Sequence, residues 1–129
     1  MDPHDRPRRE KLSRLRRELL ELQEQFGKTL EVALAGTPLV KGSVYEIARR
    51  CGNPQCRCTR GQLHRNIVVT WSDQGRHRMR SLPPERVREI RQKSKEYARF
   101  RRARAEVSRI HDRMVAVLDR IQELRREIP

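Results

Sequence analysis

The three cysteines of the chain lie within eight residues of one another, and a histidine follows them closely. The segment reads Cys51-Gly-Asn-Pro-Gln-Cys56-Arg-Cys58, and His64 comes six positions later. Thiolates and a neutral imidazole are typical ligands of Zn²⁺ in structural sites, where four of them surround the ion as a tetrahedron. We therefore predict a zinc site made by Cys51, Cys56, Cys58 and His64.

The sequence leaves two alternatives to zinc, a redox or incidental thiol cluster and an iron–sulfur site. A disulfide with one spare thiol is less attractive, because the cysteine count is odd and no signal peptide is visible. His64 is the expected fourth ligand. His77, or a residue from a partner chain, is the alternative for that position.

Positive charge is concentrated in the middle of the chain. The net charge is +14, from 31 basic and 17 acidic residues. Residues 1–35 carry 8 basic and 7 acidic side chains, residues 36–83 carry 9 and 2, and residues 84–129 carry 14 and 8. A one-sided field of this kind attracts polyanions, and nucleic acid, either DNA or RNA, is the default partner.

Arginines occupy positions from which they could contact a phosphate backbone. In a strand, Arg76, Arg78 and Arg80 would share one face at intervals of about 6.5 to 7 Å, close to the spacing of phosphates along a nucleic-acid strand. Five more arginines surround the cysteines. A Cys₃His zinc site has a net charge of about −1, and one or two arginines would be enough to compensate it. An ordinary solvated arginine face is the alternative. The candidate nucleic-acid-binding residues are Arg49, Arg50, Arg57, Arg60, Arg65, Arg76, Arg78 and Arg80.

The pattern along the chain predicts a mainly α protein in which long coiled-coil helices flank a small zinc-bound antiparallel sheet. Residues 1–8, with two prolines and no periodicity, are expected to be a disordered basic arm. Residues 9–35 are expected to form the first helix, and residues 84–129, which begin at the second proline of Pro83-Pro84, the second. Both have apolar residues at alternating steps of 3 and 4, the spacing of a coiled-coil seam. The first seam is Leu12, Leu15, Leu19, Leu22 and Phe26, and the second, from residue 100 on, is Phe100, Ala103, Val107, Ile110, Met114, Val117, Ile121, Leu124 and Ile128.

Residues 36–83 are predicted to form a small β module around the metal site. Strands are expected over residues 39–49, 67–71 and 76–82, with a hairpin turn at residues 72–75. Trp71 is expected to be a core residue of this sheet. Two or three short strands bury too little apolar surface to be stable alone, so the metal is expected to stabilise the module.

The second predicted helix is longer than the first. If the two helices pair as an antiparallel hairpin with the zinc module at their shared tip, the apolar stripe from Met114 to Ile128 has no partner within the chain. A homodimer through the C-terminal coiled coil would cover that stripe. The alternative is that the helices only splay and fray there.

Catalysis and membrane insertion have little support. Residues 36–83 contain two acidic residues, Glu46 and Asp73, and these are not spaced as an acid–base pair. A zinc ion with four protein ligands has no open position for water. No apolar stretch is long enough to cross a bilayer, so we expect a cytoplasmic, soluble protein that is not an enzyme and does not bind membranes.

Part of the chain resembles a family of small prokaryotic cysteine-rich proteins, catalogued as a domain of unknown function and often found near mobile elements. The resemblance covers roughly residues 42–110. It implies metal ligation by the three cysteines and His64, a long C-terminal helix, and no established activity. The chain departs from the family at Arg65-Asn66-Ile67, where Gly-Pro-Tyr is usual. The matching segments are Gly42-Ser43-Val44-Tyr45, the cysteine segment, Gly61-x-x-His64, Trp71 and Pro83-Pro84-Glu85.

Together these features predict a zinc-stabilised protein that binds the phosphate backbone of nucleic acid, in an accessory or regulatory role that the resemblance associates with mobile elements. The alternative is a coiled-coil assembly adaptor without nucleic-acid binding of its own.

Overall fold

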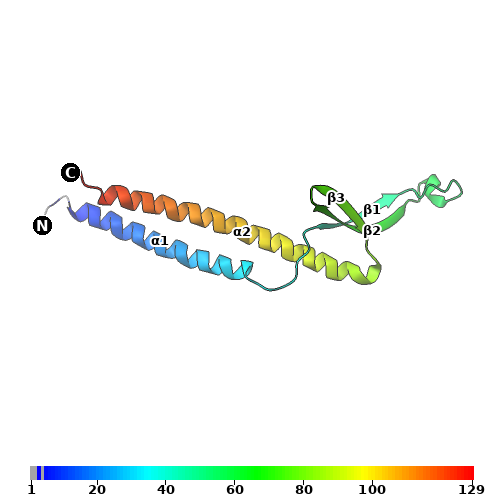
Figure 1. The fold of residues 1–129 in the computed structure, drawn as a ribbon, viewed down its shortest axis with the longest axis horizontal. Coiled ribbons are helices and arrows are strands. Elements are labelled where there is room, and N and C mark those ends of the chain that lie inside the picture. The colour runs from blue at the N-terminus through cyan, green and yellow to red at the C-terminus, as the bar shows by residue number, and fades with distance from the viewer. Residues whose placement is uncertain (1–2, 4) are drawn as a thin grey trace. The chain divides into compact units, whose positions relative to one another are not determined.

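The structure, a computed structural model, describes residue 3 and residues 5–129. The elements along the chain are two long helices, three strands and one turn of 3-10 helix (Figure 1). Two compact units are present, one made of residues 1–35 and 100–129, the other of residues 36–99. The elements are α1 (Asp5–Ala33), β1 (Ser43–Arg49), η1 (Arg57–Arg60), β2 (His64–Asp73), β3 (Arg76–Ser81) and α2 (Pro84–Arg125).

The first helix begins earlier than the sequence suggested. Of the expected disordered arm over residues 1–8, residues 1, 2 and 4 lie outside the described part, and residues 5–8 are helical. Asp5 lies in the first turn, where its negative charge interacts favourably with the positive end of the helix dipole. Its carboxylate also pairs with Arg9 at 2.9 Å. Pro7 is tolerated because the first four backbone N–H groups of a helix have no partner within it.

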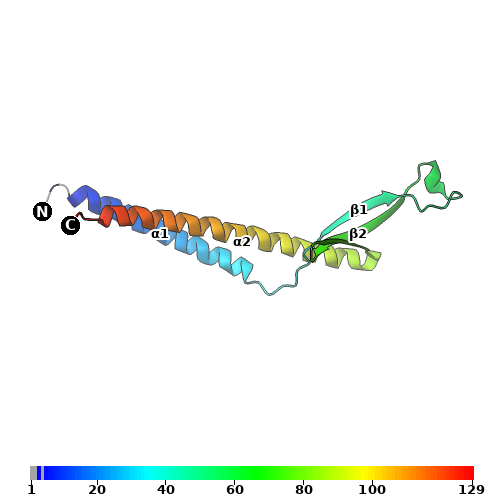
Figure 2. The ribbon, with the colours of Figure 1, turned by 45° about the horizontal axis from the view of Figure 1, so that its top comes forward.

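The first unit is an antiparallel helical hairpin of α1 with the second half of α2 (Figures 1 and 2). Its buried centre consists of Leu22, Ile110 and Val117. Residues seven apart on one helix lie on the same face, so the heptad pattern predicted this stripe correctly. The half-buried side chains packed around it are Leu15, Leu19, Phe26, Met114 and Ile121.

Within the chain, α1 covers the middle of the C-terminal stripe, which was expected to need a dimer partner. Met114, Val117 and Ile121 pack against α1 of the same chain. Ile128 lies beyond the end of α2 at Arg125 and is 92% exposed. The expected hairpin, with the zinc module at its tip, would pair α1 with the beginning of α2, whereas α1 pairs with residues 100–125.

The second unit contains the three-stranded antiparallel sheet, with β2 between β1 and β3. Arg49 of β1 lies opposite His64, and Ser43 lies opposite Thr70. The β2–β3 turn has positive φ at Gln74 and Gly75, as a two-residue hairpin of type I′ requires. The β3 strand pairs only with residues 68–73, so the four residues at the start of β2 pair with β1 alone.

The β1 strand begins at Ser43 rather than at residue 39, because the preceding segment is held by α2. The Val40 N–H donates to the Lys93 carbonyl at 3.0 Å, and the Ser94 hydroxyl donates to the Gly42 carbonyl at 2.6 Å. A side chain at Gly42 would place its Cβ 2.7 Å from the Thr70 carbonyl oxygen, so only glycine fits there without a shift.

The core of the second unit is small. Val68 and Val69 are buried although neighbouring strand residues point to opposite faces, so both faces of β2 are covered. Ile90 of α2 and Thr70 are buried in the same unit, and Trp71 is half-buried. In the part of the chain that the structure describes, neither helix is apolar over a length sufficient to cross a membrane.

Candidate metal centre and basic surface

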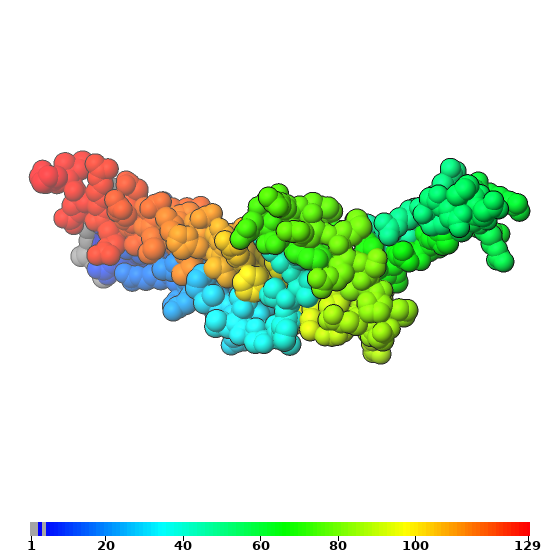
Figure 3. All heavy atoms as spheres, turned by 45° about the vertical axis from the view of Figure 1, so that its right-hand side comes forward, coloured from blue at the N-terminus to red at the C-terminus, as the bar shows by residue number. Residues whose placement is uncertain are grey.

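The segment between β1 and β2 folds into a compact knuckle that stands out from the end of the strands (Figure 3). Gly52, directly after Cys51, has φ +86, a left-handed conformation that reverses the chain at low steric cost. The Asn53 side-chain oxygen accepts the Gln55 N–H at 3.0 Å. The Cys56 N–H donates to the Asn53 carbonyl at 3.1 Å. The Gly-Asn-Pro-Gln sequence thus makes the turn that brings Cys56 back toward Cys51.

The η1 turn places the third cysteine. Thr59 stabilises its start, because its hydroxyl and its N–H both donate to the Cys56 carbonyl, at 2.7 and 3.1 Å. Gly61 caps its end in the left-handed conformation and donates its N–H to the Cys58 carbonyl at 3.4 Å. His64, the first residue of β2, completes the group from the rigid end of the sheet.

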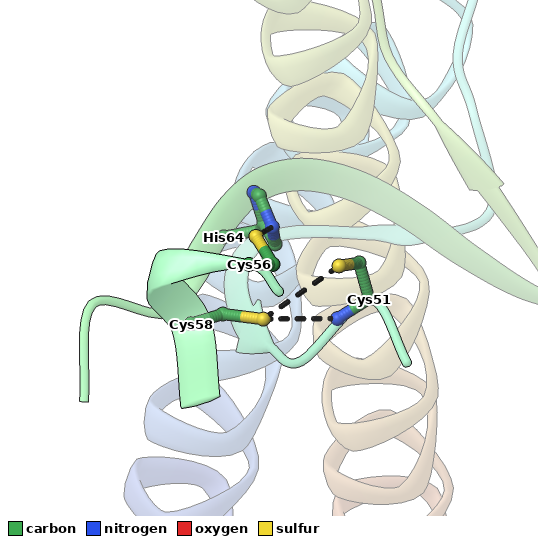
Figure 4. A group of neighbouring side chains, drawn as sticks. All are labelled: Cys51, Cys56, Cys58 and His64. Carbon is green, nitrogen blue, oxygen red and sulfur yellow. Dashed lines mark hydrogen bonds between the residues drawn. The ribbon is translucent and has the colours of Figure 1, made fainter. Parts of the chain in front are cut away.

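The structure brings all four predicted donors together (Figure 4). The Sγ atoms of Cys51 and Cys58 are 3.6 Å apart, and the Sγ atom of Cys56 lies 3.1 Å from Nε2 of His64. All four donor atoms lie within 4.8 Å of one another. The Cys51 N–H also donates to Cys58 Sγ at 3.4 Å, which orients that sulfur toward the centre of the group.

These distances fit a tetrahedral ion. With Zn–S and Zn–N bonds of about 2.3 and about 2.0 Å, a regular tetrahedron has edges of about 3.8 Å between sulfurs and about 3.5 Å between sulfur and nitrogen. The Cys51–Cys58 and Cys56–His64 separations differ from these values by a few tenths of an ångström, and every other pair of donor atoms lies within 4.8 Å. The cluster could therefore hold one metal ion with four protein ligands.

The thiols influence one another's ionisation. A backbone hydrogen bond from Cys58, together with side-chain hydrogen bonds led by that of His64, lowers the pKa of Cys56 to about 6. The backbone hydrogen bond from Cys51 lowers the pKa of Cys58, but burial and the two other cysteines outweigh it and leave this pKa raised. Three thiolates at this distance repel one another, and a divalent cation would relieve that repulsion.

The alternative fourth ligand, His77, is far from the cluster. It lies on β3 opposite Ser72, and Ser72 is eight residues along β2 from His64. At about 3.4 Å per residue, this separation is about 27 Å. The four donors therefore come from one chain, and neither His77 nor a partner's residue is needed.

The eight candidate arginines do not form one patch, because the structure separates them into two groups. Arg49, Arg50, Arg57, Arg60 and Arg65 lie on the knuckle or on the strand ends that carry it, whereas Arg76, Arg78 and Arg80 lie on β3. All eight are exposed.

Three of these arginines have neighbours that the sequence analysis did not assign to them. Arg65 pairs with Glu46 on β1 at 3.2 Å. The Arg80 guanidinium lies 5.8 Å from the centre of the Trp71 ring, and Arg78 lies 3.9 Å from Asp73. The sequence could have revealed the neighbours of the β3 arginines through the hairpin turn. With the turn at residues 74 and 75, Trp71 lies opposite Arg78 on the same face of the sheet.

The fold and the cluster define a class, a small, mainly α protein with a candidate Cys₃His metal centre on an antiparallel sheet whose chain continues into a long helix. The chain belongs to the DUF6788 family, a domain of unknown function, whose pattern matches residues 9–92. The match covers most of α1, the whole sheet and knuckle, and the start of α2. The resemblance to a cysteine-rich domain of unknown function is thus confirmed. No curated protein matches the chain, and no solved structure matches it either.

Proposed function

We propose that the cluster binds one zinc ion in a structural role. The donor set supports this, because three thiolates and an imidazole are soft to borderline ligands and four protein ligands leave no open coordination position. The site belongs to a unit with few buried residues, so metal binding would contribute directly to its folding. The ion would supply the positive charge that allows the three sulfurs to be thiolates together.

We further propose that residues 36–99 bind the phosphate backbone of nucleic acid. The observation that carries this proposal is the number of arginines without an acidic partner. Residues 36–99 contain 15 basic and 5 acidic side chains, a net charge of +10, whereas the helical unit contains 16 and 12. Among the described residues, no ion pair involves the exposed arginines Arg49, Arg50, Arg57, Arg60 and Arg76.

The geometry indicates how binding would work. Guanidinium groups present several donors that match phosphate oxygens, and they remain charged at any physiological pH. Zinc would fix the knuckle and so position its arginines before the ligand arrives, which lowers the entropy lost on binding. Contacts of this kind are made to the backbone and do not read sequence.

Exchange of the knuckle arginines tests this function. Replacing Arg49, Arg50, Arg57 and Arg60 by alanine should reduce the slope of log affinity against log salt by about 3 to 4 for duplex DNA. The matched control removes the same charge from the helical hairpin, through Arg16→Ala, Arg17→Ala, Lys28→Ala and Arg113→Ala, which lie outside the sheet and knuckle. Equal losses in the two variants would show only a general effect of charge and would contradict the proposed surface.

A groove in the helical hairpin favours a second candidate function, assembly with another copy of the chain. The groove is open, has a volume of about 580 Å³, and is largely apolar inside. Its α1 wall carries the basic Lys11 and Arg14, and its α2 wall carries the acidic Asp119 and Glu123 beside the basic Arg120. The lining residues are Lys11, Arg14, Leu15, Asp119, Arg120, Glu123 and Leu124.

This arrangement of charges fits a two-fold dimer. An axis parallel to the helices would bring α1 of one copy against α2 of the other at the same height, so the basic wall would meet the acidic wall. The result would be a four-helix bundle with antiparallel neighbours throughout. Leu15 and Leu124, at the bottom of the groove, would then be covered.

A further inference from the structure

The two arginine groups of the second unit lie at opposite ends of β2. We call Arg49, Arg50, Arg57 and Arg60 the tip arginines, and Arg76, Arg78 and Arg80 the strand arginines. Arg49 is directly opposite His64, the first residue of β2, and the other tip arginines follow it in the knuckle. The strand arginines are opposite Val69, Trp71 and Asp73.

The register gives the separation of the groups. Val69 and Asp73 are five and nine residues from His64 along β2. At about 3.4 Å per residue, the strand arginines lie about 17 to 30 Å from the start of the tip group. Arg49 and the strand arginines belong to one sheet, so their separation is fixed by strand pairing, and the knuckle that carries the other tip arginines starts from the same strand ends.

The part of the sheet between the two groups is neutral. On β1, Tyr45 and Ile47 are uncharged, and Glu46 pairs with Arg65 at 3.2 Å. On β2, residues 66–68 are Asn, Ile and Val. A ligand held by both groups must therefore carry negative charge at two separated places. The protein surface between these places offers it no compensating positive charge.

We propose that the tip and strand arginines hold one nucleic-acid duplex at two separate places on its backbone. This inference rests on the proposed function and adds the kind of ligand that the surface selects. The rise of a duplex is about 3.4 Å per base pair, so 17 to 30 Å corresponds to about 5 to 9 base pairs. A duplex is stiff over about 150 base pairs, so its phosphates stay at fixed positions across the neutral band. A single strand would first have to be ordered, which costs conformational entropy.

Two-point attachment has a measurable consequence. Once one group is bound, the other meets its phosphates at a high effective concentration, and this gain disappears when the ligand cannot reach both groups. Affinity should therefore depend on duplex length through a threshold.

The test measures binding of the full zinc-loaded chain to hairpin duplexes, closed by one constant loop, with random-sequence stems of about 4 to about 20 base pairs at constant salt and constant phosphate concentration. We expect affinity to rise at least about tenfold between about 5 and about 9 base pairs and then to level off. The variant with Arg76, Arg78 and Arg80 replaced by alanine should lose this rise while binding the shortest duplexes nearly as the parent does. Arg65→Ala is the control, because Arg65 lies in the band between the two groups, where it pairs with Glu46 at 3.2 Å, and it should keep the threshold.

Other outcomes distinguish a failure of two-point attachment from a failure of nucleic-acid binding. A smooth increase with length, or a threshold that survives in the triple variant, would overturn two-point attachment while nucleic-acid binding stands. Single strands that bind as tightly as duplexes of equal phosphate number would overturn the choice of a duplex. Absence of binding to any nucleic acid would overturn the proposed function itself.

Discussion

At the scale of single residues, Cys58 is the donor on which the metal site is centred. It has no exposed surface, its sulfur accepts the Cys51 N–H, and it lies 3.6 Å from the Cys51 sulfur. His64 reaches the same cluster from the sheet, with Nε2 3.1 Å from the Cys56 sulfur. The site therefore links the knuckle to β2, and losing either side should release the ion.

The two histidines of the sheet provide a matched pair of variants. His64→Ala removes one of the four protein ligands that a closed structural zinc site uses. The zinc content should therefore fall from about one ion per chain to less than about half of that. His77→Ala removes an exposed side chain about 27 Å away along β2 and should leave zinc content unchanged. Metal analysis of both purified proteins decides the point. Equal retention in the two variants would contradict the assigned ligand.

Protons should compete with the metal. The pKa of Cys56 is about 6, so this thiol is largely ionised at pH 7, whereas Cys58, whose pKa is raised, must release a proton when a metal binds. Metal affinity should therefore rise with pH through the neutral range and be lost in acid. Competition with a chromophoric chelator, from about pH 5.5 to about pH 8.5, measures this. An affinity that does not change over this range would contradict thiolate ligation.

At the scale of elements, the position of β1 depends on the close approach of Gly42 to β2. Gly42→Ala would place a Cβ 2.7 Å from the Thr70 carbonyl oxygen, so backbone must move, and we expect a loss of about 1 to 3 kcal/mol in the free energy of unfolding. Gly36→Ala is the control, because nothing lies within 4 Å of its Cβ position. Urea denaturation of the two variants should separate them clearly. A Gly42→Ala protein as stable as the Gly36→Ala protein would contradict this packing.

Much of the element structure could be predicted from sequence, because local patterns determine it. Heptad spacing identified the buried Leu22, Ile110 and Val117, and the turn at Gln74 and Gly75 identified the hairpin. The start of β1 could not be predicted, since it depends on hydrogen bonds from the segment before Ser43 to α2. The half of α2 that pairs with α1 depends on tertiary packing in the same way.

The candidate site also has one part that local sequence predicts and another that depends on tertiary structure. The spacing of cysteines and His64 was sufficient to name four donors that the structure brings together. Separating the arginines into two groups required the register of β2 with its neighbours, and so did the pairing of Arg65 with Glu46. When the contacts of a residue are set by the neighbouring strand, the local sequence does not predict them. The turn, which sets the register of the strands, is the exception.

At the scale of the whole molecule, the oppositely charged walls of the hairpin groove predict self-association that charge reversal should control. Lys11→Glu or Asp119→Lys alone would place like charges opposite each other in a two-fold dimer and should shift the chain toward monomer by at least about tenfold in dissociation constant. The double variant restores opposite charges and should recover the dimer. Sedimentation at several concentrations measures this. A parent chain that stays monomeric throughout would contradict the assembly, as would a double variant that behaves like the singles.

Binding of a nucleic-acid backbone by arginines on a zinc-held surface is tested most directly by the salt dependence of affinity with and without the metal. The measurement is the affinity of the full chain for a duplex of about 20 base pairs over a salt series, repeated after zinc is removed with a chelator. We predict a slope of log affinity against log salt of about −4 to −6 for the zinc-loaded chain, as expected for seven tip and strand arginines, and a smaller magnitude by about 3 without zinc. A zinc-loaded chain with no measurable binding at low salt, or with a slope that zinc removal leaves unchanged, would contradict the account.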